Sequence, residues 1–286
     1  MRYEAPTTSK EAATLMANAK GKAFVLAGGT DLLVRLKSGA IDPDLIVDIK
    51  RIEATQSISR TANGFRIGAA VSGAAMGNHS ALTKAWPGVV EATNLIGSDQ
   101  IQGRCTMAGN MCNASPAADS VPALVAASAK VAIVGPNGRR SVAAENVATG
   151  PGKTSLAKGE FVEAITLPKR APRSADAYLR FIPRTEMDIA VVSAGINLTI
   201  SAAGVITKAR VALGAVAATV LLVPKAARAI IGTKLDDKAL AKLAAACEAA
   251  CKPINDMRGT IEFRTDVAGV LGRRAAKIAY QRAGGK

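Results

Sequence analysis

Residues 24–33 read FVLAGGTDLL, which places a hydroxyl and a carboxylate directly after two glycines. The apolar run favours a strand, and the adjacent Gly28 and Gly29 would weaken any regular element that continued through them. Consecutive backbone N–H groups that no side chain covers can form a concave nest for an anion. Thr30 adds a hydroxyl donor, and Asp31 adds an acceptor for a sugar hydroxyl. We therefore expect either an anion-binding loop or a tight strand-to-helix turn here.

A second polar stretch, TMAGNMCNASPAADSVPAL over residues 106–124, again mixes small residues with hydroxyls and amides. It holds one carboxylate, Asp119, and a dense series of side-chain donors and acceptors: Thr106, Asn110, Asn113 and Ser115. Loops of this composition commonly form turns and caps. Two such loops in one domain, each flanked by apolar structure, fit a long polar ligand that spans two lobes.

Two further segments resemble nucleotide-binding motifs but lack a glycine that each motif requires. TGPGKTS at 149–155 suggests a phosphate loop, but Val147 stands where that motif needs its first glycine, so we expect a surface turn. AGGTDLL at 27–33 lacks the third spaced glycine of a dinucleotide fold.

The side chains that bind metals are sparse in this sequence. The only histidine is His79, and none of the four cysteines forms a CxxC pair: Cys105, Cys112, Cys247 and Cys251. A zinc or iron–sulfur centre needs clustered soft ligands. We interpret the cysteines as small buried apolar residues. Any redox chemistry in this chain would then need an organic cofactor.

The chain is strongly basic, with 37 Lys and Arg against 22 Asp and Glu and a formal charge of +15. Nucleic-acid binding is disfavoured because the basic residues are scattered and aromatics make up only 3%. A phosphate-bearing cofactor or an acidic partner subunit would use the same charge. The N-terminus lacks a secretory signal, and the apolar run at 211–223 is too short to span a membrane. We expect a cytoplasmic protein.

Hydrophobic periodicity and turn residues predict mixed secondary structure. Helices are expected at 9–20 with Ser9 as N-cap, at 81–97 with a break near Pro87, and at 117–128, 225–251 and 265–283. Strands are expected at 23–28 (buried), 44–50, 63–72, 160–168, 189–201 and 205–217, with a hairpin at 130–144. Residues 100–116 are expected to be irregular, and 168–177, with two prolines, to be a linker.

With these motifs in order, the chain resembles the FAD-binding medium subunit of the molybdenum hydroxylases, the family of xanthine dehydrogenase and aerobic carbon monoxide dehydrogenase. AGGTDLL resembles the first flavin loop of the family, and TMAGNMCNASPAAD resembles the second. GKTSLAKGEFVEAITLP is similar to the segment before the interdomain linker. RFIPRTEMDIAVVSAGI and INDMRGTIEFRTDVAGVLGRRA are similar to the start and the last helix of the C-terminal domain. The five motifs are collinear and cover essentially all 286 residues.

The resemblance implies an α+β fold in two domains. Residues 1–173 would form a two-lobed FAD-binding domain of the vanillyl-alcohol-oxidase type, with the lobes meeting near 55–62. Residues 174–286 would form a small α+β C-terminal domain.

The resemblance also implies which residues bind FAD. Ala27 to Leu33 would wrap the pyrophosphate, the second loop would lie by the pyrophosphate and flavin, and Asp119 would accept from ribityl or adenosine hydroxyls. The full set implied is Val25, Leu26, Ala27, Gly28, Gly29, Thr30, Asp31, Leu32, Leu33, Thr106, Ala108, Gly109, Asn110, Ser115, Asp119, Val162 and Arg180. No catalytic proton-transfer residue and no metal ligand are expected.

The chain departs from the family pattern at three positions. Arg180 stands where many relatives carry a flavin-contacting lysine, which keeps the charge but changes the geometry. Ala108 replaces a common glycine, and Ile96 replaces the aromatic of animal xanthine dehydrogenases. The cysteine-rich insert of 4-hydroxybenzoyl-CoA reductase relatives is missing, which argues against that branch.

The function implied is electron transfer. FAD in this chain would take electrons from [2Fe-2S] clusters in a small partner subunit, which receives them from a molybdenum–pterin site in a large one. The acceptor would be NAD, a quinone or dioxygen, and the three subunits would form a heterotrimer that dimerises to a heterohexamer. The alternatives are a free-standing FAD-dependent oxidoreductase of the same fold and a basic binding protein without cofactor. The substrate stays open, because its pocket would lie in another subunit.

Overall fold

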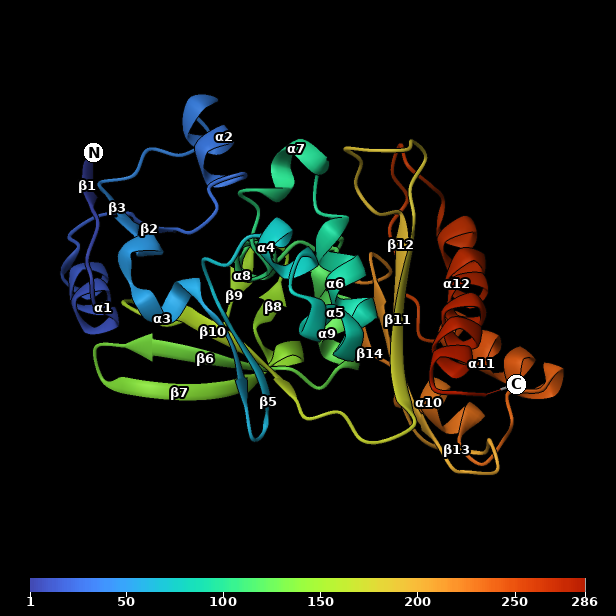
Figure 1. The fold of residues 1–286 in the computed structure, drawn as a ribbon. Helices are drawn as coiled ribbons and strands as arrows, with labels where there is room; N and C mark the ends of the chain where they lie inside the picture. The colour runs from blue at the N-terminus through green and yellow to red at the C-terminus, as the bar shows by residue number, and fades with distance from the viewer. Residues whose placement is uncertain (286) are drawn as a thin grey trace.

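The computed structural model describes residues 1–285. The chain runs from an N-terminal lobe at one end of the molecule, through a central lobe, to a sheet-and-helix domain at the other end (Figure 1).

The first lobe is built on a parallel sheet. Its strands are β1 (Arg2–Glu4), β3 (Leu45–Asp48) and β2 (Ala23–Leu26), in that spatial order. The helices are α1 (Ser9–Asn18) and α2 (Leu32–Lys37). The predicted Ser9 cap is wrong by one residue, because Thr8 Oγ1 accepts the Glu11 N–H at 3.2 Å while the Ser9 hydroxyl bonds to Glu163.

Strand β2 was expected to be buried, and the structure corrects this. Only Leu26 of its four residues is buried. Ala23, Phe24 and Val25 line a cavity, as described below. The apolar residues of this strand therefore line the cavity as well as the core.

The second lobe is built on an antiparallel sheet of order β4-β5-β10-β6-β7. The strands are β4 (Ile58–Thr61), β5 (Gly64–Gly68), β6 (Lys130–Gly135), β7 (Gly138–Ala143) and β10 (Phe161–Pro168). The expected hairpin at 130–144 is confirmed as β6 and β7. Gly64 holds φ +130° in the turn between β4 and β5, where a Cβ would lie 2.0 Å from the Leu167 carbonyl oxygen.

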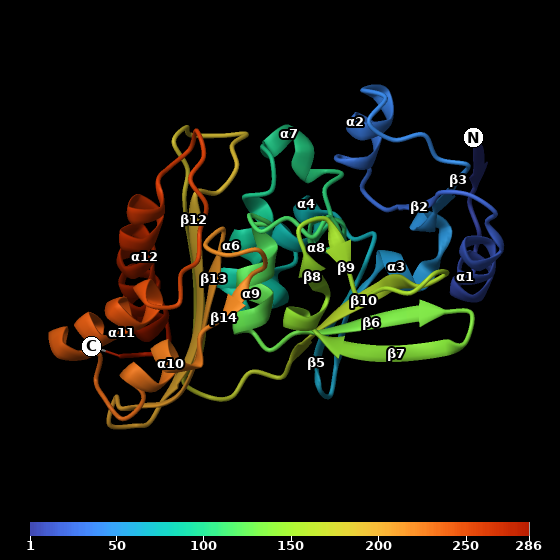
Figure 2. The same cartoon turned by 180° about the vertical axis from the view of Figure 1, so that it is seen from behind.

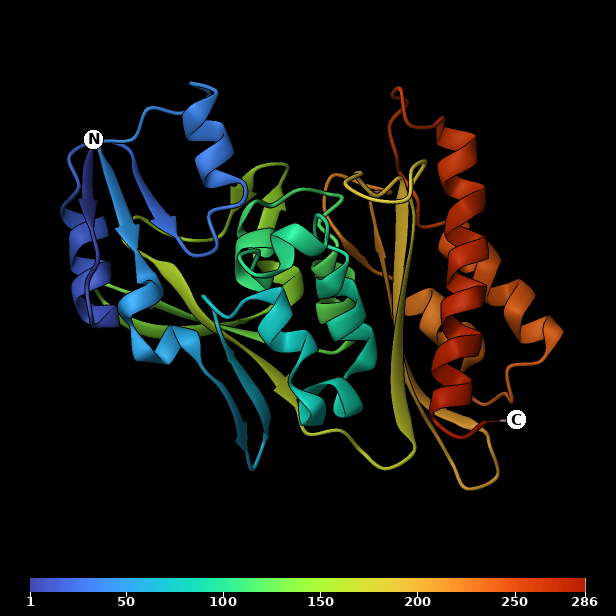
Figure 3. The ribbon, with the colours of Figure 1, turned by 45° about the horizontal axis from the view of Figure 1, so that its top comes forward.

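Short helices pack around this second lobe, and those near the middle of the chain, among them α6 and α9, lie between its sheet and the C-terminal domain (Figure 3). They are η1 (Ile49–Arg51), α3 (Glu53–Gln56), α4 (Gly73–Gly77), α5 (Ser80–Ala85), α6 (Pro87–Asn94), α7 (Asp99–Gln102), α8 (Met107–Cys112), α9 (Ser120–Ala126) and η2 (Ala144–Asn146). The break at Pro87 is confirmed, because α5 ends and α6 begins with this proline at its first position. The expectation that 100–116 is irregular is wrong over α7 and α8, because the turn and cap residues Gly103, Thr106 and Gly109 conceal two short helices.

The C-terminal domain is an antiparallel sheet of order β11-β12-β13-β14 with helices on its outer face (Figure 2). The strands are β11 (Ser174–Phe181), β12 (Val192–Ile200), β13 (Ile206–Gly214) and β14 (Leu221–Leu222). The helices are α10 (Pro224–Ile230), α11 (Asp237–Glu248) and α12 (Ile261–Arg282). The single helix predicted over 225–251 is two helices, because Gly232 and Leu235 between them adopt φ +85° and +59°.

Two arginine side chains form contacts between the C-terminal domain and the central lobe. Arg170, between β10 and β11, lies 3.7 Å over the Trp86 ring and donates to Asp176 at 2.6 Å. Arg210 on β13 donates to the Val125 carbonyl at 3.0 Å and to Glu145 at 3.0 Å. Part of the excess of basic residues therefore serves the junction between the domains. Within the described residues, no helix has the length and apolar character needed to cross a lipid bilayer.

Candidate functional site

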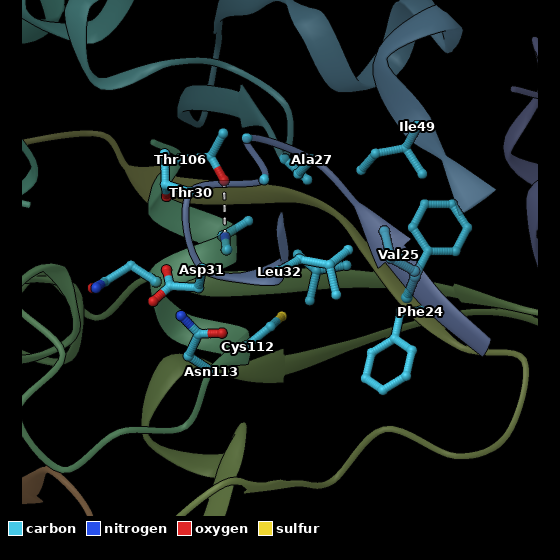
Figure 4. A pocket seen from close by; sticks show the side chains of 18 of the residues that line it. Phe24, Val25, Ala27, Thr30, Asp31, Leu32, Ile49, Thr106, Cys112 and Asn113 are labelled. Atoms are coloured by element: carbon cyan, nitrogen blue, oxygen red, sulfur yellow. Dashed lines mark hydrogen bonds between the residues drawn. The ribbon is translucent and has the colours of Figure 1, made fainter. Parts of the chain in front are cut away.

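A cavity of about 540 Å³ lies between the first and second lobes. One wall comes from the end of β2 and the segment that leads into α2. The facing wall comes from α8, the start of β10 and the small hairpin of β8 (Ala148–Gly150) and β9 (Lys153–Thr154). Figure 4 shows Thr30 and Asp31 of the first wall close to Thr106 and Asn113 of the second.

The two glycines of the first wall have separate structural causes. Gly28 lies where a Cβ would come within 2.0 Å of the Arg104 carbonyl oxygen, so the first polar loop packs directly against the segment that precedes the second. Gly29 adopts φ +84°, the left-handed conformation that glycine adopts without strain. Both glycines are therefore explained by the protein's own packing, and the tight turn is present.

This turn also leaves donors free. Within residues 1–285, the backbone N–H groups of Gly28, Gly29, Thr30 and Asp31 make no hydrogen bond to a protein acceptor. All four residues line the cavity. Gly28, Gly29 and Thr30 are half-buried, and half-buried N–H groups are nearly always paired, so this row of free donors indicates a place for an anion.

The second wall is organised by its own caps. Thr106 Oγ1 accepts the Gly109 N–H at 2.9 Å and thereby begins α8. Asn110 accepts the Ser120 N–H at 3.0 Å and the Ser120 hydroxyl at 2.7 Å through its side-chain oxygen. Because the Ser120 N–H can only donate, the orientation of this amide is determined, and the Asn110 NH₂ group is left as a donor at the cavity.

Apolar side chains form much of the remaining lining: Met16, Phe24, Ile49, Ile96, Leu156, Phe161 and Val162. Cys105 and Cys112 also line the cavity, and burial raises the pKa of their thiols to about 11 and about 12. Both thiols are therefore neutral at physiological pH.

Charged groups lie at the edge of the cavity. Asp31, Arg35 and Glu160 line it. Arg140 hydrogen-bonds to Glu160 and holds the pKa of this carboxyl below its ordinary value, against the opposing effect of burial. Glu160 is therefore an anion paired with its own cation.

Twelve of the residues implied by the sequence line this one cavity: Val25, Ala27, Gly28, Gly29, Thr30, Asp31, Leu32, Thr106, Ala108, Gly109, Asn110 and Val162. Five are not part of its lining. Leu26 is buried beneath the first wall, and Leu33 is exposed on α2. Ser115 accepts the Ala117 N–H at 3.2 Å in its own turn.

The remaining two, Asp119 and Arg180, bond to each other at 2.8 Å. Asp119 precedes α9 and is next to Ser120, the partner of Asn110, so the pair lies just beyond the cavity at the domain junction. Burial raises the pKa of Asp119, and the Arg180 guanidinium opposes this rise.

Several residues that line the cavity were not predicted from the sequence. Met16, Phe24, Arg35, Ile49 and Leu156 line the cavity, and their residue types resemble those of ordinary core or surface positions. The expected turn at 149–155 is present between β8 and β9, but Gly152 and Thr154 of this hairpin face the cavity. The Gly152 N–H donates to the Ala114 carbonyl at 3.0 Å, which ties the hairpin to the second loop.

The cavity fits a long ligand that carries phosphates. Free backbone donors at residues 28–31 suit a diphosphate, and the apolar walls suit planar rings. A Cβ on Gly109 would meet only Thr106 Oγ1, at 2.8 Å, so the protein leaves this part of the cavity open. The fold and the site together define a binding protein for a dinucleotide-sized cofactor.

Comparisons with known proteins identify the family. Residues 1–170 match the FAD binding domain in molybdopterin dehydrogenase, and residues 177–279 match the C-terminal domain of CO dehydrogenase flavoproteins. The chain therefore belongs to the family of FAD-binding medium subunits of molybdenum hydroxylases, and it is an oxidoreductase subunit with an FAD-binding domain.

Individual relatives match this chain in sequence along almost its whole length. The carbon monoxide dehydrogenase medium chain of Afipia carboxidovorans is 32% identical over 281 residues, 98% of this chain and 97% of its own. The xanthine dehydrogenase FAD-binding subunit of Escherichia coli O157:H7 is 28% identical over 286 residues, 99% of this chain and 97% of its own. A carbon monoxide dehydrogenase structure from Oligotropha carboxidovorans superposes with a TM-score of 0.94 at 32% identity, over 99% of this chain and 98% of that one. The expected α+β two-domain fold is confirmed.

Proposed function

We propose that this chain is the electron-transfer flavoprotein subunit of a molybdenum hydroxylase. FAD, when bound, would supply the redox chemistry, accepting electrons from [2Fe-2S] clusters of a small partner subunit and giving them to NAD, a quinone or dioxygen. The molybdenum–pterin site would lie in a large partner subunit. The chain's own residues bind, orient and shield the cofactor.

The observation that carries this proposal is the row of free N–H donors at Gly28 to Asp31, set against the open surface of α8. These donors would hold the pyrophosphate without a counter-charge, and Asn110 would add its NH₂ group. The apolar walls would exclude water from the ring systems. The Ser115, Asp119 and Arg180 contacts stay predictions, since an extended cofactor that continues past Asn110 would meet the Asp119–Arg180 pair.

The proposal includes the organisation of the protein. We place the domain boundary at 173/174, in the segment between the end of β10 and the start of β11, and the lobe boundary near 55–62, around α3 and β4. The assembly would be a heterotrimer with one large and one small subunit, dimerised to a heterohexamer in the cytoplasm. The relatives are themselves named as medium chains and FAD-binding subunits, which supports the need for partners.

Gly109→Leu tests the proposed site. Its side chain would enter space that the protein leaves open, and only the Thr106 hydroxyl would have to shift. We expect the apo protein to keep its melting temperature within a few degrees, because Leu is a better helix former than Gly by roughly 0.5–1 kcal/mol. The loss of the Thr106 cap would offset this gain.

In the same variant, FAD binding should be abolished. Gly103→Leu is the matched control, since a Cβ there has no neighbour within 4 Å and Gly103 does not line the cavity. Wild-type FAD affinity in a folded Gly109→Leu protein would contradict the proposed site. A wild-type protein that binds no FAD would favour the cofactor-free alternative.

A further inference from the structure

A lysine lies behind the first wall of the cavity, on the side away from the ligand space. Lys50 is in η1, directly after β3, and its Nζ donates to the Ala27 carbonyl at 3.2 Å. The same ammonium lies 2.8 Å from Asp48 Oδ1, and the side chain is 34% exposed. Lys50 does not line the cavity.

Asp48 positions Lys50 through an ion pair and a hydrogen bond to its backbone. Its carboxylate is 9% exposed, and it accepts from the Lys50 backbone N–H at 2.9 Å and from the Tyr3 hydroxyl at 2.6 Å. Burial would raise the pKa of Asp48, but the hydrogen bonds from Lys50 and Tyr3 hold it below its ordinary value. A carboxylate that is ionised at neutral pH therefore positions the ammonium beside the Ala27 carbonyl.

The Ala27 contact determines the orientation of one peptide. A peptide bond is planar and trans, so its N–H points opposite to its carbonyl. With the Ala27 oxygen directed at Lys50, the Gly28 N–H is directed away from Lys50, and Gly28 is part of the cavity wall. Glycine on one side of this peptide makes rotation of the peptide plane easy. A rotated peptide would turn a carbonyl oxygen toward the phosphate instead of a donor.

We propose that Lys50 is a positioning residue for the pyrophosphate of the cofactor, which it serves through the Ala27–Gly28 peptide rather than by contact. This inference rests on the proposed function. Its ligand chemistry is a diphosphate anion. Tyr3 and Asp48 are the supports of Lys50, and together the three side chains link β1, β3 and the end of β2.

The test is a comparison of variants of the full chain with three probes: FAD, ADP and adenosine. Lys50→Met should weaken FAD and ADP by a common factor, roughly ten-fold or more, because a hydrogen bond from a charged group is lost. Adenosine, which has no phosphate, should bind as it does to the wild type. Lys50→Arg should restore FAD binding, since a guanidinium can reach both Asp48 and Ala27.

Arg51→Met is the charge-matched control. It removes one cation next in sequence, and the Arg51 side chain makes no hydrogen bond or ion pair in the part of the chain that the structure describes. If Lys50 acted only as a distant positive charge, Arg51→Met would weaken FAD as much as Lys50→Met, and the proposal would be overturned. Should Lys50→Met fail to fold, Lys50→Gln, which can still donate to Asp48, carries the same comparison.

Two further outcomes also overturn the proposal. One is an unchanged FAD affinity in Lys50→Met. The other is an equal loss for adenosine, which would mean that the cavity as a whole had changed. Both leave the proposed function standing as long as the wild type binds FAD.

Discussion

Arg180 Nη1 lies 2.8 Å from Asp119 Oδ1, and the two side chains are 5% and 12% exposed. The bond joins β11 of the C-terminal domain to the start of α9 in the FAD-binding domain. Tyr178, also on β11, approaches the same carboxylate oxygen at 3.4 Å. Two residues for which the family resemblance implies FAD binding thus form a buried ion pair between the domains, and Asp119 is next to the Ser120 that orients Asn110.

Removing one member of this pair should destabilise the whole chain. Arg180→Met strips the cation from a buried carboxylate, and breaking such a pair costs about 3–5 kcal/mol. Chemical unfolding of the full chain measures this loss. The double variant Asp119→Asn/Arg180→Met should lose less than the sum of the single variants, because it leaves no unpaired charge. Additive losses would mean that the two side chains act independently.

Asp119→Ala should lower FAD affinity as well as stability, because it disturbs Ser120 and, through it, the Asn110 amide. Equilibrium dialysis of the folded variant against FAD measures the effect. Unchanged FAD affinity together with reduced stability would restrict Asp119 to the domain junction.

Substitution of Gly28 or Gly29 should lower the stability of the protein even without ligand. Gly28→Ala would place a methyl 2.0 Å from the Arg104 carbonyl oxygen, and we expect the apo protein to lose about 1–3 kcal/mol from overpacking. Gly29→Ala would hold φ +84° at a cost of about 1–2 kcal/mol. Gly103→Ala, with no neighbour within 4 Å, is the neutral control. Apo melting curves that match the wild type for Gly28→Ala would show that Gly28 does not pack against Arg104 as described.

The cysteines should be slow to react with Ellman's reagent. Burial raises the pKa of Cys247 to about 12 and of Cys251 to about 11, as it does for the two thiols at the cavity. At pH 8 the native protein should therefore react far more slowly than a free thiol of pKa about 8.5.

Added FAD should slow Cys105 and Cys112 further, since only these two line the cavity, and leave Cys247 and Cys251 unchanged. Mass spectrometry of the labelled peptides separates the four. Protection of Cys247 by FAD would place the ligand elsewhere.

Asp48 should contribute to stability at neutral pH and not in acid. Its folded-state pKa is lowered, so its contribution is present above the ordinary carboxyl pKa and is lost as the pH falls through the lowered value, below about pH 4. The stability difference between the wild type and Asp48→Asn should shrink over that acid range. Denaturant titrations at a series of pH values measure it, and a difference that grows toward low pH would show the opposite sign of linkage.

The two loops that line the cavity could be predicted because their residues are locally unusual. Two adjacent glycines and a run of small polar residues mark Gly28 and Gly109 without any knowledge of the fold. Phe24 and Ile49 carry no such mark, because an apolar residue that faces a ligand has the same sequence signature as one that faces a core.

Contacts between distant segments were beyond sequence reasoning for a different reason. Lys50 reaches Ala27 only because parallel pairing of β2 and β3 brings Leu26 opposite Asp48. Nothing in the sequence spacing specifies that register. The helix α8 was missed because Thr106, Gly109 and Asn110 are cap and turn residues in isolation, and tertiary packing overrides that preference.

Flavin and metal analysis of the full chain, both expressed alone and isolated by pull-down from its native host, tests the assignment as a flavoprotein subunit most directly. Expressed alone, it should take up one FAD per chain and contain neither iron nor molybdenum. Across residues 1–285, no three His, Cys, Asp or Glu side chains gather closely enough to hold a metal ion. Isolated from its host, it should bring iron and molybdenum with two further subunits. A chain that binds no FAD, or that holds stoichiometric iron on its own, would contradict the central claim.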